Sequence, residues 1–203
     1  MSKRVKEKLS EEDVLEIFQK KGALLSGHFR LSSGLHSGKY LQCALVLQYP
    51  DLAEKLCKEL ASGLELHGSK IDAVVSPAIG GIIVGQEMAK VFRCRAIFCE
   101  REEGKMKLRR GFEIRKGEKV VVVEDVITTG GSVKEIIEIV QGRGGKVEVV
   151  GVIVDRSKPS LSDELATLNL SLNSLLRIDI ETYSPEECPL CKKGIPLEKP
   201  GSR

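Results

Sequence analysis

Two adjacent carboxylates, Glu124 and Asp125, follow a run of four valines and precede a turn rich in threonine, glycine and serine. Four β-branched residues in a row are typical of a strand buried on both faces of a parallel sheet. The turn at 128–132 allows close approach to an anion, to which its hydroxyls and the first N–H groups of a following helix can donate. The carboxylates need a different partner, such as sugar hydroxyls or a metal ion. The segment therefore predicts a ribose phosphate site, with a tight turn capped by a serine as the alternative.

A second glycine-rich turn, at residues 76–81, ends a strand predicted over 71–75 and precedes a predicted helix. This position suits the diphosphate half of a ligand. The turn, which includes Ile79-Gly80, contains no cationic side chain, so any contact with a diphosphate must come mainly from its backbone. Close packing of a strand–helix turn is the alternative.

Cations gather in the connection at 100–118, which contains Arg101, Lys105, Lys107, Arg109 and Arg110 and almost no apolar residues. A structureless connection of this length between two strands is usually functional or disordered. We interpret the segment as a mobile cationic lid that neutralises a departing anion and excludes water from the site. A solvated charged surface is the alternative.

Arg156 follows the strand predicted over 146–155, at the same carboxyl edge of the predicted sheet as the acidic pair. An arginine there offers a planar fork of donors to a carboxylate, and an ordinary surface arginine is the alternative.

The histidines and cysteines give weaker signals. Cys188 and Cys191 form half of a zinc knuckle, but a structural zinc needs about four ligands and the chain has no second Cys-x-x-Cys pair. We therefore expect two reduced cysteines in a C-terminal turn, with a metal site or a disulfide as the alternatives. His28, His36 and His67 lie in unpaired contexts and are interpreted as ordinary polar residues.

The pattern of elements predicts an α/β fold. Strands alternate with helices from residue 71 onward, which favours a parallel sheet with right-handed crossovers. Helices are expected over 10–22, 50–67, 80–92 and 132–143, and strands near 29–31 and over 40–47, 71–75, 94–99, 119–124, 146–155 and 172–180.

Composition limits the remaining classes. The 203 residues carry a net charge of +3, which is too small to indicate nucleic acid as the main partner. No apolar run approaches the length of a membrane span, and the N-terminus lacks the apolar core of a signal peptide. We expect a cytoplasmic protein of one domain with reduced cysteines.

The segment 120–132 resembles the phosphoribosyl-diphosphate (PRPP) signature of the type I phosphoribosyltransferases. Three further segments, at 29–40, 100–105 and 155–156, look like those of orotate phosphoribosyltransferases, and the tail at 188–203 looks like that of a bacterial and archaeal subgroup. The resemblance implies the type I phosphoribosyltransferase fold, a mostly parallel open sheet flanked by helices. It also implies one domain over 1–203, with a hood at about 1–48 and 170–203 and a core sheet at about 49–169.

The resemblance further implies transfer of ribose 5-phosphate from PRPP to N1 of orotate, in pyrimidine biosynthesis. Mg²⁺ would arrive with PRPP rather than on protein ligands, and the chain would form a homodimer in which the loop reaches the neighbouring subunit. Arg156 and Thr128 would bind orotate, and Lys105, Arg101 and Asp125 would be catalytic. PRPP would be bound by Glu124, Asp125, Val126, Ile127, Thr128, Thr129, Gly130, Gly131, Ser132, Arg101 and Lys105.

The chain departs from the resembled pattern at three places. Lys105-Met106-Lys107-Leu108 replaces a loop Lys-x-His-Gly, Ser32 replaces a lysine, and Tyr40-Leu41 replaces a Phe-Phe pair. Without a loop histidine, we expect electrostatic stabilisation of the leaving group to carry catalysis. A purine phosphoribosyltransferase and a non-catalytic PRPP-sensing regulator are the alternative functions.

Overall fold

The computed structural model describes residues 8–31, 33–66 and 68–200. Ser32 and His67, which the sequence analysis considered, lie outside the described residues. The main sheet has six strands in the order β5-β4-β3-β6-β7-β8, and a smaller sheet has the order β1-β2-β9. The main sheet consists of β3 (Ala73–Pro77), β4 (Arg95–Glu102), β5 (Lys105–Leu108), β6 (Lys119–Ile127), β7 (Lys146–Asp155) and β8 (Leu172–Arg177).

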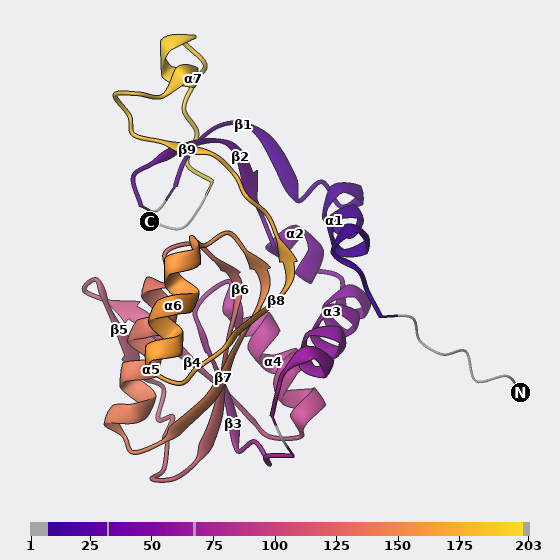
Figure 1. Cartoon of the computed structure of the whole chain (residues 1–203), viewed down its shortest axis with the longest axis vertical. Helices are drawn as coiled ribbons and strands as arrows, with labels where there is room; N and C mark the ends of the chain where they lie inside the picture. The colour runs from indigo at the N-terminus through magenta and orange to yellow at the C-terminus, as the bar shows by residue number, and fades with distance from the viewer. Residues whose placement is uncertain (1–7, 32, 67, 201–203) are drawn as a thin grey trace, which may run out of the picture.

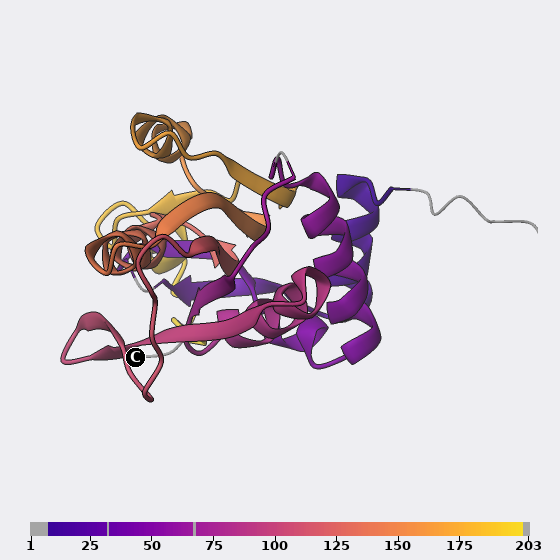
Figure 2. The ribbon, with the colours of Figure 1, turned by 90° about the horizontal axis from the view of Figure 1, so that it is seen from below.

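Helices cover both faces of the main sheet (Figure 2). Three helices, α1 (Glu11–Lys20), α3 (Pro50–Gly63) and α4 (Gly81–Phe92), pack on one face, and α5 (Gly131–Gly142) and α6 (Pro159–Thr167) lie on the other. The valines of β6 supply both cores, since Val121 and Val123 belong to the first cluster and Val120 and Val122 to the second. Successive strand residues point to opposite faces, so the run of valines is buried on both sides, as predicted.

The hood lies at one end of the main sheet (Figure 1). We use this name for β1 (Leu24–Arg30), β2 (His36–Leu41), β9 (Thr182–Tyr183), α7 (Pro189–Lys192) and the tail up to residue 200. The tail returns to β1, because the Glu198 N–H donates to the His28 carbonyl and the Arg30 N–H donates to the Glu198 carbonyl, each at 2.8 Å. Residues 172–177, which the sequence expectation assigned to the hood, instead form β8 and pair with β7 in the main sheet.

The predicted helices and central strands are confirmed, with shifted ends. Ser10 caps α1 in a capping box with Asp13, because each side chain accepts from the other residue's backbone N–H. Residues 44–47, predicted as part of a strand, form the short helix α2 (Ala44–Leu47) instead. Its Val46 and Leu47 are buried, and a short apolar run cannot be told from a buried helix by its pattern alone.

The connection at 100–118 is not structureless, so that expectation is wrong. Strand β4 continues to Glu102, and a two-residue turn returns the chain into β5, which pairs antiparallel with β4. Both turn residues, Glu103 and Gly104, have positive φ, which matches the twist of a tight hairpin. Met106 is buried against the core, so the segment carries enough apolar contact to pack on it. The hairpin projects beyond the rest of the sheet (Figures 1 and 2).

Candidate active site

The acidic pair lies within β6 rather than after it. The strand runs to Ile127, so Glu124 and Asp125 point to opposite faces of the sheet near its carboxyl end. Asp125 lies on the α4 side and Glu124 on the α5 side, where the charge of Arg101 acts to lower its pKa. The two carboxylates therefore flank the strand end instead of forming one acidic surface.

Burial makes both carboxyl groups hold protons more tightly than usual. Burial, together with the charge of Asp125, raises the pKa of Glu124 to about 8. Burial also raises the pKa of Asp125, although backbone hydrogen bonds and the Cys43 thiol oppose that change. Two partly buried acids that flank one strand end favour the arrival of hydroxyl donors or a cation, because either would stabilise the ionised form.

The two glycine-rich turns meet at Asp125. A Cβ atom on Gly80 would lie 2.7 Å from both carboxylate oxygens of Asp125, so only glycine allows this approach. The turn is fixed to the sheet by the Ala78 N–H, which donates to the Cys99 carbonyl at 2.7 Å, and the peptide bond between Ala78 and Ile79 is cis. Residues 76–81 thus place a backbone surface directly beside the acidic strand end.

The N-terminus of α5 is open to an anion. Gly130 is the N-cap, with φ of +73°, and no side chain caps the first turn. The alternative of a serine-capped turn is therefore wrong, because Ser132 lies inside the helix. Thr128 and Thr129 are exposed just before it. Free N–H groups, the helix dipole and two hydroxyls together make a site for a phosphate.

The side chains of Val126 and Ile127, the other two residues of the predicted PRPP segment, pack against the hydrophobic core. Ile127 is buried in the cluster under α5, and Val126 packs against the cluster under α4. The Ile127 carbonyl accepts from the Arg156 N–H at 2.9 Å, which ties the ends of β6 and β7 together.

Arg156 carries an unpaired buried donor. Its Nε is buried and has no hydrogen-bond partner within the described part of the chain, and the neighbouring Ser157 Oγ is in the same state. Burial lowers the pKa of Arg156, and the nearby Tyr40 and Cys43 oppose this change. Burying a guanidinium donor without a partner is unfavourable, so the geometry suits an anionic acceptor from a ligand.

Tyr40 and Cys43 join this site without having been predicted there. Burial, and then the charges of Asp125 and Cys43, raise the pKa of Tyr40, while Arg156 acts to lower it. The Cys43 Sγ lies 3.8 Å from the Asp125 carbonyl oxygen. Tyr40 was noted only as a departure from a family pattern, and its place at the end of β2 gave no further signal.

Ion pairs hold the β4–β5 hairpin against the body of the protein. Arg101 donates to Glu135 of α5 at 2.6 Å and 3.3 Å, and the Met106 N–H donates to the same carboxylate at 2.9 Å. Although partial burial acts to raise the pKa of Glu135, these hydrogen bonds outweigh it and lower the pKa. Lys105 at the hairpin turn is exposed and has no ion-pair partner among residues 8–31, 33–66 and 68–200.

The pairs along the hairpin engage most of the other predicted cations. Lys107 pairs with Glu102, Arg110 pairs with Glu100, and Arg109 lies between both carboxylates at 3.3 Å and 3.1 Å. These pairs are largely exposed and add little stability, but they leave Lys105 as the cation of the hairpin that is free for a ligand.

Two further observations concern a possible metal site and possible membrane-spanning helices. Within the described residues, the group of His, Cys, Asp or Glu side chains with three or more converging donor atoms lies in the hood, outside this site. The described helices include none that is long and apolar enough to cross a membrane.

A mostly parallel open sheet with an acidic strand end, two glycine-rich turns and an uncapped helix N-terminus suits a ribose phosphate ligand. Comparison with known proteins identifies the protein family. The family described as "Phosphoribosyl transferase domain" matches residues 47–174, a stretch that includes both turns, the hairpin and Arg156. The chain belongs to the phosphoribosyltransferase family.

Within that family, two similar proteins are both orotate phosphoribosyltransferases. The orotate phosphoribosyltransferase of Desulforamulus reducens is 53% identical over 195 residues, which cover 96% of this chain and 98% of that protein. The orotate phosphoribosyltransferase of Thermotoga maritima is 49% identical over 190 residues, covering 94% and 98% of the two chains.

Solved structures agree on the fold. Orotate phosphoribosyltransferase from Aeropyrum pernix aligns with a TM-score of 0.67 and 30% identity over 81% of this chain and 93% of that one. Adenine phosphoribosyltransferase from Rhodothermus marinus aligns with a TM-score of 0.63 and 18% identity, covering 82% and 99% of the two chains. The fold alone therefore does not select the base.

Proposed function

We propose that this protein transfers ribose 5-phosphate from PRPP to N1 of orotate, giving orotidine 5′-monophosphate and pyrophosphate, a step of pyrimidine biosynthesis. The similar orotate phosphoribosyltransferases support this assignment over nearly the whole chain. The structural observation that carries it is the buried, unpaired Nε of Arg156 at the carboxyl edge of the sheet.

Orotate differs from the other common bases by its carboxylate. A half-buried arginine whose Nε is buried and lacks a partner suits a planar anion, since Arg–carboxylate pairs form parallel charge-assisted hydrogen bonds. A neutral purine would leave the guanidinium unpaired, so the purine alternative has no observation in its favour. Tyr40 closes the same space from β2, and the exposed Thr128 lies one residue after β6.

PRPP would bind between the two glycine-rich turns, at residues 76–81 and 128–132. The 5-phosphate fits the open N-terminus of α5 with Thr128, Thr129 and Ser132, and the diphosphate fits the backbone of 76–81. Glu124 and Asp125 would accept hydrogen bonds from the ribosyl hydroxyls. Their raised pKa values mean that binding of donors or cations also drives release of protons from the site.

Mg²⁺ fits the donors that the site offers. Carboxylate oxygens are ligands that Mg²⁺ prefers, and this ion is usually held by one or two carboxylates together with substrate phosphates. Because Glu124 and Asp125 point to opposite faces of β6, the ion would be carried mainly by the phosphates of PRPP, with at most one of these carboxylates beside it. The ion would neutralise charge on the diphosphate, while the protein residues orient the ribosyl group and keep its hydroxyls bonded.

The leaving pyrophosphate needs positive charge that the 76–81 turn does not bring. Arg101 stands near Glu124 and is fixed by Glu135, whereas Lys105 is exposed at the tip of a projecting hairpin. We propose that Arg101 organises the hairpin and that Lys105 stabilises the departing charge, in a homodimer where Lys105 serves the neighbouring subunit. The extension of the hairpin tip beyond the rest of the sheet supports the exchange (Figure 1).

A base-selection assay tests the proposed function. Purified protein is incubated with PRPP, Mg²⁺ and one of orotate, uracil, hypoxanthine or adenine, and pyrophosphate release is followed. We expect turnover with orotate alone. Turnover with hypoxanthine or adenine would refute the base assignment, and absence of turnover with every base would favour a PRPP-sensing regulator.

A further inference from the structure

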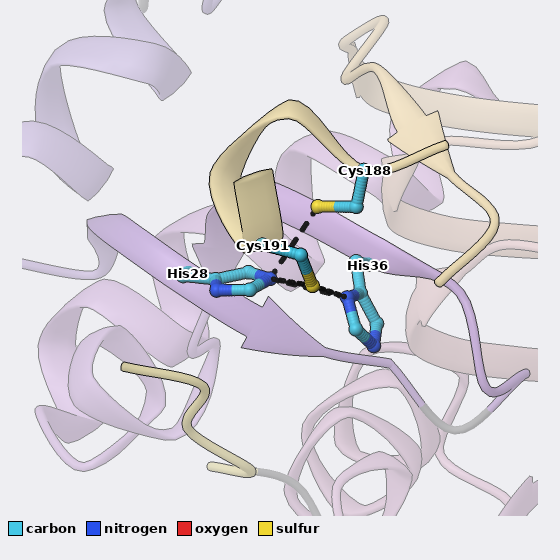
Figure 3. Close-up of side chains that lie close together, drawn as sticks. All are labelled: His28, His36, Cys188 and Cys191. Carbon is cyan, nitrogen blue, oxygen red and sulfur yellow. Dashed lines mark hydrogen bonds between the residues drawn. The ribbon is translucent and has the colours of Figure 1, made fainter. Parts of the chain in front are cut away.

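Four side chains with metal-binding atoms converge in the hood, far from the acidic strand end. They are His28 of β1, His36 of β2, Cys188 at the N-cap of α7 and Cys191 within α7 (Figure 3). One donor atom from each lies within 4.8 Å of the others. His28, His36 and Cys188 are buried, and Cys191 is exposed. The expectation that the two histidines are unpaired polar residues is wrong.

Local structure brings each pair of side chains together. In the β1–β2 hairpin Arg30 lies opposite His36, and the pairing register shifts between Ser26 and Phe29. His28 lies in this irregular part of β1, where its Nε2 is 3.1 Å from His36 Nδ1. Cys188 precedes the first turn of α7 and Cys191 lies inside it, so the turn directs both thiols toward the hairpin. Gly194, with φ of +67°, then ends the turn.

The distances match those between ligands of one tetrahedral ion. Zinc bonds of about 2.0–2.1 Å to nitrogen and about 2.3 Å to sulfur separate two nitrogens by about 3.3 Å and a nitrogen from a sulfur by about 3.6 Å. His28 Nε2 and His36 Nδ1 are 3.1 Å apart. Cys188 Sγ lies 3.4 Å and Cys191 Sγ 3.7 Å from His28 Nε2, and Cys191 Sγ lies 3.3 Å from His36 Nδ1.

The protonation of His28 favours a central cation over a hydrogen-bonded cluster. Its Nδ1 lies 2.8 Å from the Ile195 carbonyl oxygen, which can only accept, so the proton of a neutral ring is on Nδ1 and Nε2 carries a lone pair. His36, Cys188 and Cys191 all approach that one lone pair. One lone pair cannot accept hydrogen bonds from three groups at once. One cation, in contrast, can be bound by all four ligand atoms, two nitrogens and two sulfurs. A backbone carbonyl on the other ring nitrogen is also the usual outer partner of a metal-bound histidine.

We propose that His28, His36, Cys188 and Cys191 bind one Zn²⁺ ion per chain in a closed structural site. Two thiolates and two imidazoles are a common zinc ligand set, and four protein ligands leave no open position for catalysis. Two thiolates neutralise the charge of Zn²⁺, which makes the site compatible with burial.

The site would stabilise a part of the fold that has few apolar contacts of its own. The smaller sheet has three strands, and residues 191–199 of the tail are exposed. A metal that joins β1, β2 and α7 would hold the tail on the hairpin, as in other small units whose folding depends on zinc. The proposal is independent of the assigned reaction, since no ligand belongs to the candidate active site.

Zinc content of the full-length protein tests the proposal. Wild type, Cys188→Ser/Cys191→Ser and the control Cys94→Ser are purified without a metal-affinity tag, and their metal is measured by mass spectrometry. We expect one zinc per chain in wild type and in Cys94→Ser, and at least a tenfold loss in the double variant. Equal zinc in all three proteins, or none in reduced wild type after incubation with Zn²⁺ and gel filtration, would overturn the proposal.

Cobalt gives a readout that does not depend on the variants folding. Wild-type protein loaded with Co²⁺ in place of zinc should show the strong visible absorption of a tetrahedral ion and a thiolate-to-cobalt charge-transfer band, both removed by one equivalent of Zn²⁺. The weak spectrum of six-coordinate Co²⁺ would contradict a closed site. A Cys188–Cys191 disulfide in protein purified under reducing conditions would contradict it equally.

Discussion

Replacing Glu124 with glutamine should stabilise the protein at alkaline pH and leave its stability near pH 5 almost unchanged. Burial, together with the charge of Asp125, raises the pKa of Glu124 from 4.5 to about 8. Between these values the folded protein keeps a proton that the unfolded chain has released. The stability linked to that proton is complete below about pH 4.5 and is lost as the pH rises through about 8, whereas the glutamine amide stays neutral throughout.

The pKa interval sets the size of the effect. At about 1.4 kcal/mol for each pKa unit, the change from 4.5 to about 8 corresponds to at most about 5 kcal/mol. Relaxation around the ionised group reduces this, so we expect a gain of about 2–4 kcal/mol at pH 9. At about 2–4 °C for each kcal/mol in a chain of this size, the Tm of the variant should exceed that of wild type by about 4–16 °C.

Thermal unfolding of ligand-free protein, followed by circular dichroism from pH 5 to pH 9, measures this difference. The matched control is Glu138→Gln, the same change on the exposed face of α5, which should track wild type at every pH. A Tm difference for Glu124→Gln that is the same at pH 5 and pH 9 would refute a buried, protonated Glu124.

Two further predictions concern the helix turn and the hairpin. Gly130→Ala should destabilise the protein by about 1–3 kcal/mol in chemical denaturation, because its φ is +73° and its Cβ would lie 2.5 Å from Leu161, whereas Gly142→Ala at the open end of the same helix should be neutral or stabilising. Lys105→Ala should lower kcat about 10²–10³-fold with little change in Tm, and wild-type kcat would show that this lysine is dispensable. Mixing Lys105→Ala with Asp125→Asn chains, each inactive alone, should restore activity if the hairpin acts across subunits, and activity will stay absent if it acts within one.

The main sheet and the acidic strand end could be predicted because their signals are local. The role of each could be inferred from a few neighbouring residues. This holds for the valines at 120–123, for the carboxylates that follow them and for the glycines at 80 and 130. The hairpin was missed because β5 contains only two apolar residues, Met106 and Leu108. The many charged residues over 100–118 made the whole segment look polar. Glu103-Gly104 was the available signal, since such a pair fits the two-residue turn of a hairpin.

The hood cluster could not be predicted by spacing, because its halves are far apart in the chain. His36 and Cys188 are separated by about 150 residues, and only the register of β1 with β2 and the return of the tail along β1 bring them together. The unpaired Nε of Arg156 likewise depends on tertiary packing, which the sequence alone does not show. The sequence predicted Arg156 at a strand end, but it could not show that its Nε is buried or that Tyr40 and Cys43, from another part of the chain, lie near it.

Steady-state kinetics of Arg156→Ala test the central claim most directly. Losing a charge-assisted hydrogen bond of about 1.5–3 kcal/mol should raise the KM for orotate roughly 10- to 150-fold and change that for PRPP by less than about twofold. Arg177→Ala, an exposed arginine opposite Asp155 at the same sheet edge, is the control and should change neither value. Equal rises for both substrates, or an unchanged KM for orotate, would contradict the assignment of Arg156 to the orotate carboxylate.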